Sequence, residues 1–175
     1  MKTLVIIFCC LVIYFQTIAQ TQNQDTINWR VNYKLKGDDF KGTPDSNSVN
    51  AAVSSTAINY KIIKKDSFID VIVYCSFNKL WSWNKYKSEK AILKHEQGHF
   101  DISELFARKF RMLVRKGKFK DNSDAIVLYS KIMAERELFD TQYDNETDFS
   151  NDSKKQLYWN NKITLEINKL NAYKE

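Results

Sequence analysis

The stretch His95-Glu96-Gln97-Gly98-His99 has the pattern H-E-x-x-H, and its two histidines are the only ones in the chain. Residues four apart share one face of a helix, so both imidazoles can bind one metal ion while Glu96 reaches a water on it. Zinc suits this set because the ion lowers the pKa of that water and a nearby carboxylate can take its proton. The motif therefore predicts a Zn2+ site with His95 and His99 as ligands and Glu96 as general base. Two core histidines bonded to backbone groups are the alternative reading.

The residues around the motif are typical of a long amphipathic helix. Ser88 or a neighbour can cap its start, and Gly117 can end it after Lys116. Apolar side chains share a stripe with the two histidines at helical spacing, namely Ile92, Ile102, Phe106, Phe110 and Leu113. This stripe predicts that the imidazoles face the interior of the protein.

Alternating apolar residues before this helix predict strands. The period-2 pattern occurs in residues 29–35, 52–63 and 68–77. The polar residues 64–67 between the last two predict a hairpin. A loop rich in turn-forming residues follows the first predicted strand, and Phe40 is the residue expected to hold it to the core.

Two more helices are expected after the motif helix. Asp121 and its neighbours mark the start of one, which continues to about Glu146, and Asn151, Asp152 or Ser153 can cap the last. Strands first and helices second predict an α+β fold, in which N-terminal antiparallel strands pack with a zincin-like H-E-x-x-H helix and two further C-terminal helices.

Residues 1–19 have the pattern of a signal peptide. Lys2 precedes an apolar run from Leu4 to Phe15, and Ala19 ends a short stretch that resembles a cleavage site. An uncleaved anchor is the alternative, but the run is shorter than the ~20 residues that a membrane span requires. We therefore expect a secreted or periplasmic protein in which residues 20–175 form a single zincin-like α+β domain.

Composition limits the partners of such a domain. Cleavage would leave Cys75 as its only cysteine, so no internal disulfide can form and a packed core must stabilise it. The net charge of +6 comes from Lys and Arg mixed with acids rather than from one basic block. We expect loose association with anionic envelope surfaces, no nucleic-acid partner, and a peptide or protein substrate. The sequence does not specify an oligomeric state.

The site needs a third ligand, and the simplest classes do not provide it. A metzincin would require Gly and His where the chain has Ile102 and Leu105, so this class is excluded. A gluzincin would use a glutamate from a later helix, and Glu135 and Glu137 are available without the usual following aspartate.

The segment from His95 to Lys109 resembles the central segment of the domain of unknown function 922 family, described as predicted secreted zinc-dependent proteases. Other motifs fit in the same order over nearly the whole mature chain: Asp39-Phe40-Lys41-Gly42, Ile58-Asn59-Tyr60, Ser82-Trp83, Tyr143-Asp144-Asn145-Glu146-Thr147, Gln156 and Trp159. The resemblance implies a secreted metallopeptidase.

One position departs from the pattern of that family. Its segment Y-D-x-E-T-x-H ends in a histidine that is the natural third ligand, and Phe149 stands there in this chain. An acidic neighbour can replace it, and we expect Asp148, which adjoins the lost position, to be the third metal ligand. Asp144 and Glu146 are expected to support the ligands or cap a helix instead. If no acid substitutes, the chain is a non-catalytic envelope binding or structural protein with a degraded metal site.

Overall fold

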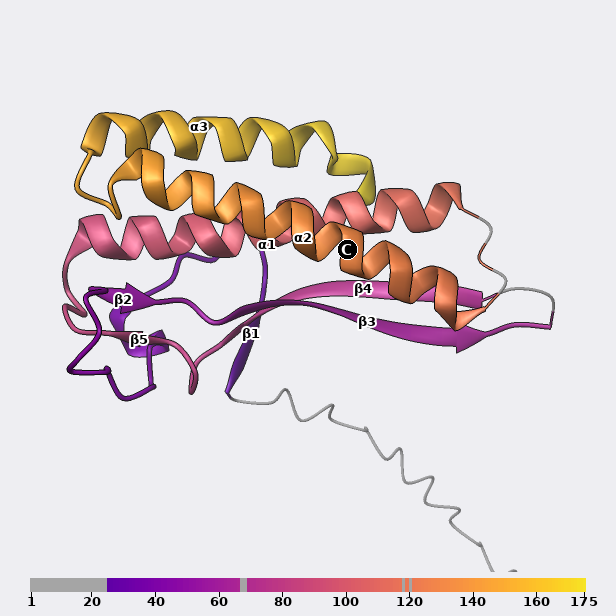
Figure 1. Cartoon of the computed structure of the whole chain (residues 1–175), viewed down its shortest axis with the longest axis horizontal. Helices are drawn as coiled ribbons and strands as arrows, with labels where there is room; N and C mark the ends of the chain where they lie inside the picture. The colour runs from indigo at the N-terminus through magenta and orange to yellow at the C-terminus, as the bar shows by residue number, and fades with distance from the viewer. Residues whose placement is uncertain (1–24, 67–68, 118, 120) are drawn as a thin grey trace, which may run out of the picture.

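The computed structural model describes residues 25–66, 69–117, 119 and 121–175, and the signal peptide expected in residues 1–19 lies outside this part of the chain. The fold is α+β, with strands preceding helices as the sequence predicts (Figure 1). The strands are β1 (Thr26–Asn28), β2 (Ala52–Val53), β3 (Thr56–Lys64), β4 (Ile69–Asn78) and β5 (Trp83–Asn84). The helices are α1 (Lys90–Lys116), α2 (Asn122–Thr147) and α3 (Ser153–Lys169), with short 3-10 turns at Gly37–Asp39 and Asn171–Tyr173.

Helix α1 is the centre of the molecule. One side of it packs on β3 and β4, and its other sides contact α2 and α3, so it lies between the sheet and the other two helices (Figure 1). This position explains why polar residues of the H-E-x-x-H motif are buried along with its apolar stripe. The helix ends at Gly117, whose N–H donates to Leu113 O, as the sequence predicts.

The sheet has the order β1-β4-β3, and both of its pairings are antiparallel. The predicted hairpin pairs Thr56 with Phe77 at one end and Lys64 with Ile69 at the other. Alternate β4 side chains face α1 and are buried, namely Ile69, Val71, Val73, Cys75 and Phe77. Strands β2 and β5 form a separate short ladder beside the start of α1.

The strand predicted for residues 29–35 is wrong. The ladder of β1 ends at Asn28, and the chain then turns, with Tyr33 N–H donating to Arg30 O. The Trp29 N–H still donates to Cys75 O of β4, but further hydrogen bonds of this segment go to side chains of α1: Trp29 Nε1 donates to Asp101 and the Leu35 N–H donates to Gln97 Oε1. The period-2 pattern therefore belongs to a loop that contacts the helix and not to a strand: Leu35 is buried and Trp29 and Tyr33 are half-buried, but Val31 is exposed.

No helix in the described ranges combines the length and the apolar character needed to cross a bilayer.

Candidate metal centre

Two helices bring three possible ligands together. His95 and His99 lie one turn apart on α1, and Asp144 reaches them from α2. The Asp144 Oδ1 atom lies 3.1 Å from His95 Nε2 and 3.0 Å from His99 Nε2. One ligand atom from each of the three residues lies within 4.8 Å of the other two, which is the spacing of a shared metal ion.

His99 Nδ1, the ring nitrogen that faces away from Asp144, contacts a charged pair of residues, Asp140 and Arg136, which we call the relay. The Nδ1 atom lies 3.0 Å from Asp140 Oδ1, and Asp140 Oδ2 lies 3.1 Å from Nε of Arg136. Arg136 donates in turn to the Thr56 hydroxyl at 2.7 Å, which connects the relay to β3. A carboxylate on the second nitrogen of a ligating histidine fixes the ring orientation and makes the first nitrogen a better ligand.

His95 Nδ1, which also faces away from Asp144, contacts a neutral side-chain amide. The Nδ1 atom lies 3.0 Å from Gln156 Oε1, on α3. The Gln156 amide nitrogen donates to the Tyr143 hydroxyl and to Asn160 Oδ1, so the amide oxygen is the atom that faces His95. The Tyr143 hydroxyl in turn donates to the backbone carbonyl of His95.

These contacts determine the tautomer of each neutral histidine ring. Because Nδ1 of both rings faces an acceptor, each neutral imidazole carries its proton on Nδ1 and turns the lone pair of Nε2 toward Asp144. Two lone pairs and a carboxylate oxygen then face one another, which is unfavourable unless a cation lies between them. A proton or a metal ion can serve as that cation.

In the protein without a metal ion, the pKa values of His99 and Asp144 indicate that a proton serves as this cation. Burial by itself lowers the pKa of His99, but its hydrogen bonds to Asp140 and Asp144 raise that pKa to about 10. Burial raises the pKa of Asp144, and hydrogen bonds from the two histidines outweigh burial and hold the pKa well below its usual range. The site therefore keeps a charged imidazole beside a charged carboxylate, and a divalent cation must displace that proton.

Glu96 lies beside the three possible ligands but is not one of the group. It is 4% exposed, and its Oε2 atom has no hydrogen-bond partner among the described residues. It lines an open cleft of about 940 Å³ together with His95, His99 and Asp144. A buried carboxylate oxygen without a partner costs free energy, so its placement toward the cleft indicates a group that acts on something bound there.

Gly98 is required by the packing behind the motif. A Cβ at this position would overlap with the Tyr143 hydroxyl. That hydroxyl connects Gln156 to the His95 backbone, and the Tyr143 ring stacks on the His95 ring with centroids 4.7 Å apart. The glycine inside the helix therefore lets α2 approach closely enough for Asp144 to reach the histidines.

Asp148, the third ligand expected from the sequence, is not brought into this group. It follows Asp144 at the helical spacing of four, but α2 ends at Thr147 and Asp148 adopts a left-handed conformation with φ 47°. Its side chain is exposed. Phe149 and Ser150 also have positive φ, and the three-residue turn places Phe149 at the wall of the cleft.

Sequence reasoning placed Asp144 in a supporting role and missed Asp140. One signal was available: Arg136, Asp140 and Asp144 repeat every four residues, which puts all three on one face of a predicted helix. The gluzincin-type candidates Glu135 and Glu137 lie off this face and are exposed.

Models of known protein families give no match to this chain, and neither curated protein sequences nor solved structures give a significant one. The resemblance to the domain of unknown function 922 family thus stays a prediction.

Proposed function

We propose that this protein is a zinc-dependent hydrolase of the peptidase class, with His95, His99 and Asp144 as metal ligands and Glu96 as general base. The observation that carries the proposal is the convergence of both histidine Nε2 atoms on one oxygen of Asp144 while each Nδ1 is held from behind. Two imidazoles and a carboxylate are the protein ligands of several catalytic zinc sites. This set replaces the Asp148 ligand that the sequence favoured.

The charge around the site fits a divalent cation. Three carboxylates, Glu96, Asp140 and Asp144, lie around the two histidines, and Arg136 lines the same cleft. Two histidines and one carboxylate also suit Fe(II). Glu96 favours zinc, because a second carboxylate next to such ligands is the arrangement in which zinc hydrolases activate water.

The groups of the chain have distinct roles in this proposal. A bound zinc ion would supply Lewis acidity, lowering the pKa of a water and polarising a carbonyl. Glu96 accepts the proton of the attacking water and passes it to the leaving amine. Asp140 and Gln156 keep the imidazoles oriented.

The cleft is compatible with an extended peptide. Residues 49–54, which include the short strand β2, form one wall of it, and the turn at Phe149 contributes to another. The volume of about 940 Å³ is in the range of sites that bind small molecules and short peptide segments. We further infer a zincin-like arrangement around α1 and export by the predicted signal peptide, so the substrate would be an extracytoplasmic peptide or protein.

The test is zinc titration combined with a broad peptide-cleavage screen on residues 20–175. Asp144→Ala should weaken zinc binding by several orders of magnitude, whereas the matched variant Asp148→Ala should leave it unchanged, since only Asp144 meets the histidines. Glu96→Gln should retain zinc and lose turnover. Elemental analysis of the purified protein should find zinc rather than iron.

Other results would contradict specific parts of the proposal. Loss of zinc in Asp148→Ala with retention in Asp144→Ala would restore the ligand set expected from the sequence. Weak binding by the parent that Phe149→His strengthens would support the non-catalytic protein with a degraded site. Tight zinc binding without turnover on any peptide would assign the metal a structural role.

A further inference from the structure

A rigid loop presents two large apolar side chains to solvent at the end of the sheet. Leu80 and Trp81, directly after β4, are 51% and 74% exposed. Asn78 Oδ1 accepts hydrogen bonds from the backbone N–H groups of both at 3.0 and 3.1 Å, and the Ser82 hydroxyl donates to Asn78 O. The exposure is therefore built into an ordered turn and does not come from a disordered loop.

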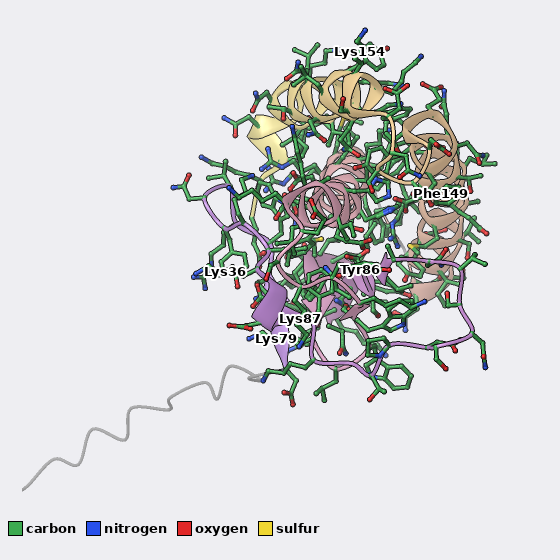
Figure 2. All side chains as sticks on the ribbon, turned by 90° about the vertical axis from the view of Figure 1, so that its left-hand side faces the viewer. Lys36, Lys79, Tyr86, Lys87, Phe149 and Lys154 are labelled. Carbon is green, nitrogen blue, oxygen red and sulfur yellow. The ribbon has the colours of Figure 1, made fainter. Side chains whose placement is uncertain are left out.

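Lysines surround this loop. Lys79 precedes Leu80, and the Lys41 N–H donates to Lys79 O at 2.9 Å. Gly37, which follows Lys36, packs so closely against Lys87 that a Cβ on it would overlap with the Lys87 carbonyl, so the segments that carry Lys36 and Lys87 are neighbours. Figure 2 shows Lys36, Lys79 and Lys87 together on one side of the molecule, far from Lys154 on α3. We call Leu80, Trp81, Lys36, Lys41, Lys79 and Lys87 the basic tip.

Acidic groups reduce the charge of the basic tip without cancelling it. Asp25 lies 3.9 Å from Lys41, and the Asp39 carboxylate is buried, where it accepts from the Tyr33 hydroxyl and the Lys36 N–H. Asp38 is exposed nearby. The four lysines therefore exceed the exposed acids around them, and the patch keeps a positive potential.

The basic tip also adjoins the point where the described chain begins. Lys79 N–H donates to Asp25 O at 2.8 Å, and Figure 1 shows the loop after β4 beside the start of β1. Asp25, the first residue that the structure describes, therefore lies beside the basic tip.

From these observations we propose that the basic tip docks on the surface of a bilayer containing anionic phospholipid. Trp has an apolar body and one polar N–H, so it is stable at the headgroup level of a membrane. Lysines around it add electrostatic attraction to anionic headgroups and can extend their ammonium groups into the headgroup layer. The proposal does not depend on the hydrolase function, and its test needs neither metal nor turnover.

The test is cosedimentation of residues 20–175, which contain the whole described fold, with lipid vesicles. Vesicles of phosphatidylcholine and phosphatidylglycerol in equal amounts should bind the protein, and pure phosphatidylcholine should bind it far less. Binding should be strong at about 0.1 M salt and lost near 1 M, where the Debye length falls from about 10 Å to about 3 Å. Tryptophan fluorescence should shift to shorter wavelength on binding, since Trp81 enters a less polar layer.

Matched variants distinguish the contribution of the basic tip to vesicle binding from that of the net charge of the protein. Lys79→Glu with Lys87→Glu should weaken binding by roughly thirtyfold or more, because each lysine near an anionic surface contributes about fivefold. Lys154→Glu with Lys155→Glu makes the same charge change on exposed residues of α3 and should have little effect. Trp81→Ser should remove the fluorescence shift, whereas Leu157→Ser, at an exposed apolar residue of α3, should not.

Three results would overturn the proposal. One is equal weakening by the two double charge variants, which would mean attraction by net charge alone. Another is equal binding to neutral and anionic vesicles. The third is no vesicle binding by a parent protein with a native circular dichroism spectrum. This result would indicate that the exposed loop binds a protein partner and not a membrane.

Discussion

The two halves of α1 both bury charged and polar side chains, but they satisfy them differently. In the C-terminal half, the Glu104 carboxylate accepts from Arg108 Nε at 2.8 Å and Arg111 NH1 at 3.0 Å. The two guanidinium groups also bind backbone carbonyls, with Arg108 donating to Ile167 O and Arg111 to Val73 O. In the N-terminal half, both histidines turn their lone pairs to one carboxylate and Glu96 Oε2 has no partner among the described residues.

This difference separates a structural cluster from a functional one. The Glu104 cluster is complete: opposite charges pair, and its arginines connect the helix to β4 and α3. In the histidine cluster both Nδ1 atoms have protein partners, whereas the Nε2 atoms, Asp144 and Glu96 lie at a cleft. A buried polar cluster that lacks a partner on the side of a cleft is the arrangement expected of a binding site.

The largest effect should come from breaking the complete cluster. Glu104→Gln removes the charge that both arginines share, so the free energy of unfolding should fall by about 3–5 kcal/mol. The matched control Glu166→Gln breaks the exposed pair with Lys169 and should cost less than about 1 kcal/mol. Urea denaturation measures both, and a loss below 1 kcal/mol in Glu104→Gln would contradict the structural role of this cluster.

A somewhat smaller effect is expected at the contact between α1 and α2. Gly98→Ala should destabilise the protein by about 1–3 kcal/mol and weaken zinc binding, because the added methyl group displaces Tyr143. In a Tyr143→Ala background the same substitution should cost much less, since the space is then available. Additive losses in thermal denaturation would show that Tyr143 is not the group that Gly98 accommodates.

Removing the support of one ligand should affect the metal more than the fold. Asp140→Asn keeps the shape of the side chain but removes the charge behind His99, so zinc affinity should fall about 10- to 100-fold. Competition with a chelator of known affinity measures this change. Glu137→Gln, at an exposed residue of the same helix, is the control. An unchanged zinc affinity in Asp140→Asn would show that Asp140 does not support His99 as a ligand.

The smallest effect is the change in metal-free stability over one pH unit. The pKa of His99 is raised from 6.5 to about 10 on folding, so the folded protein holds a proton that the unfolded chain releases above pH 6.5. This stabilisation is fully present below pH 6.5 and is lost as pH rises toward 10, by at most about 1.4 kcal/mol per pH unit.

Thermal denaturation in a chelator between pH 6.5 and 7.5 should therefore show a falling Tm, and the slope should decrease in His99→Asn. Zinc competes with the same proton, so the increase in Tm caused by zinc should grow over that range. A zinc effect that shrinks as pH rises would contradict the assignment of His99 as a ligand.

The sequence alone determined features that depend on neighbours along one helix or one hairpin. The H-E-x-x-H pair, the end of α1 before Gly117, a cap of α3 within residues 151–153 and the inward face of β4 all follow from local spacing and local hydrogen bonds. Such features could be predicted because the 3.6-residue and 2-residue periods place these residues regardless of the rest of the chain.

Only the tertiary structure decided which acid meets the histidines and what residues 29–35 become. Asp144 and Asp148 are equivalent in a helical repeat, but α2 ends between them, and the close approach at Gly98 brings only Asp144 to α1. Residues 29–35 have the pattern of a strand, yet after Trp29, whose N–H still donates to Cys75 O of β4, the segment turns and the Leu35 N–H donates to Gln97 of α1. Both outcomes depend on contacts between segments far apart in the sequence, which no local period encodes.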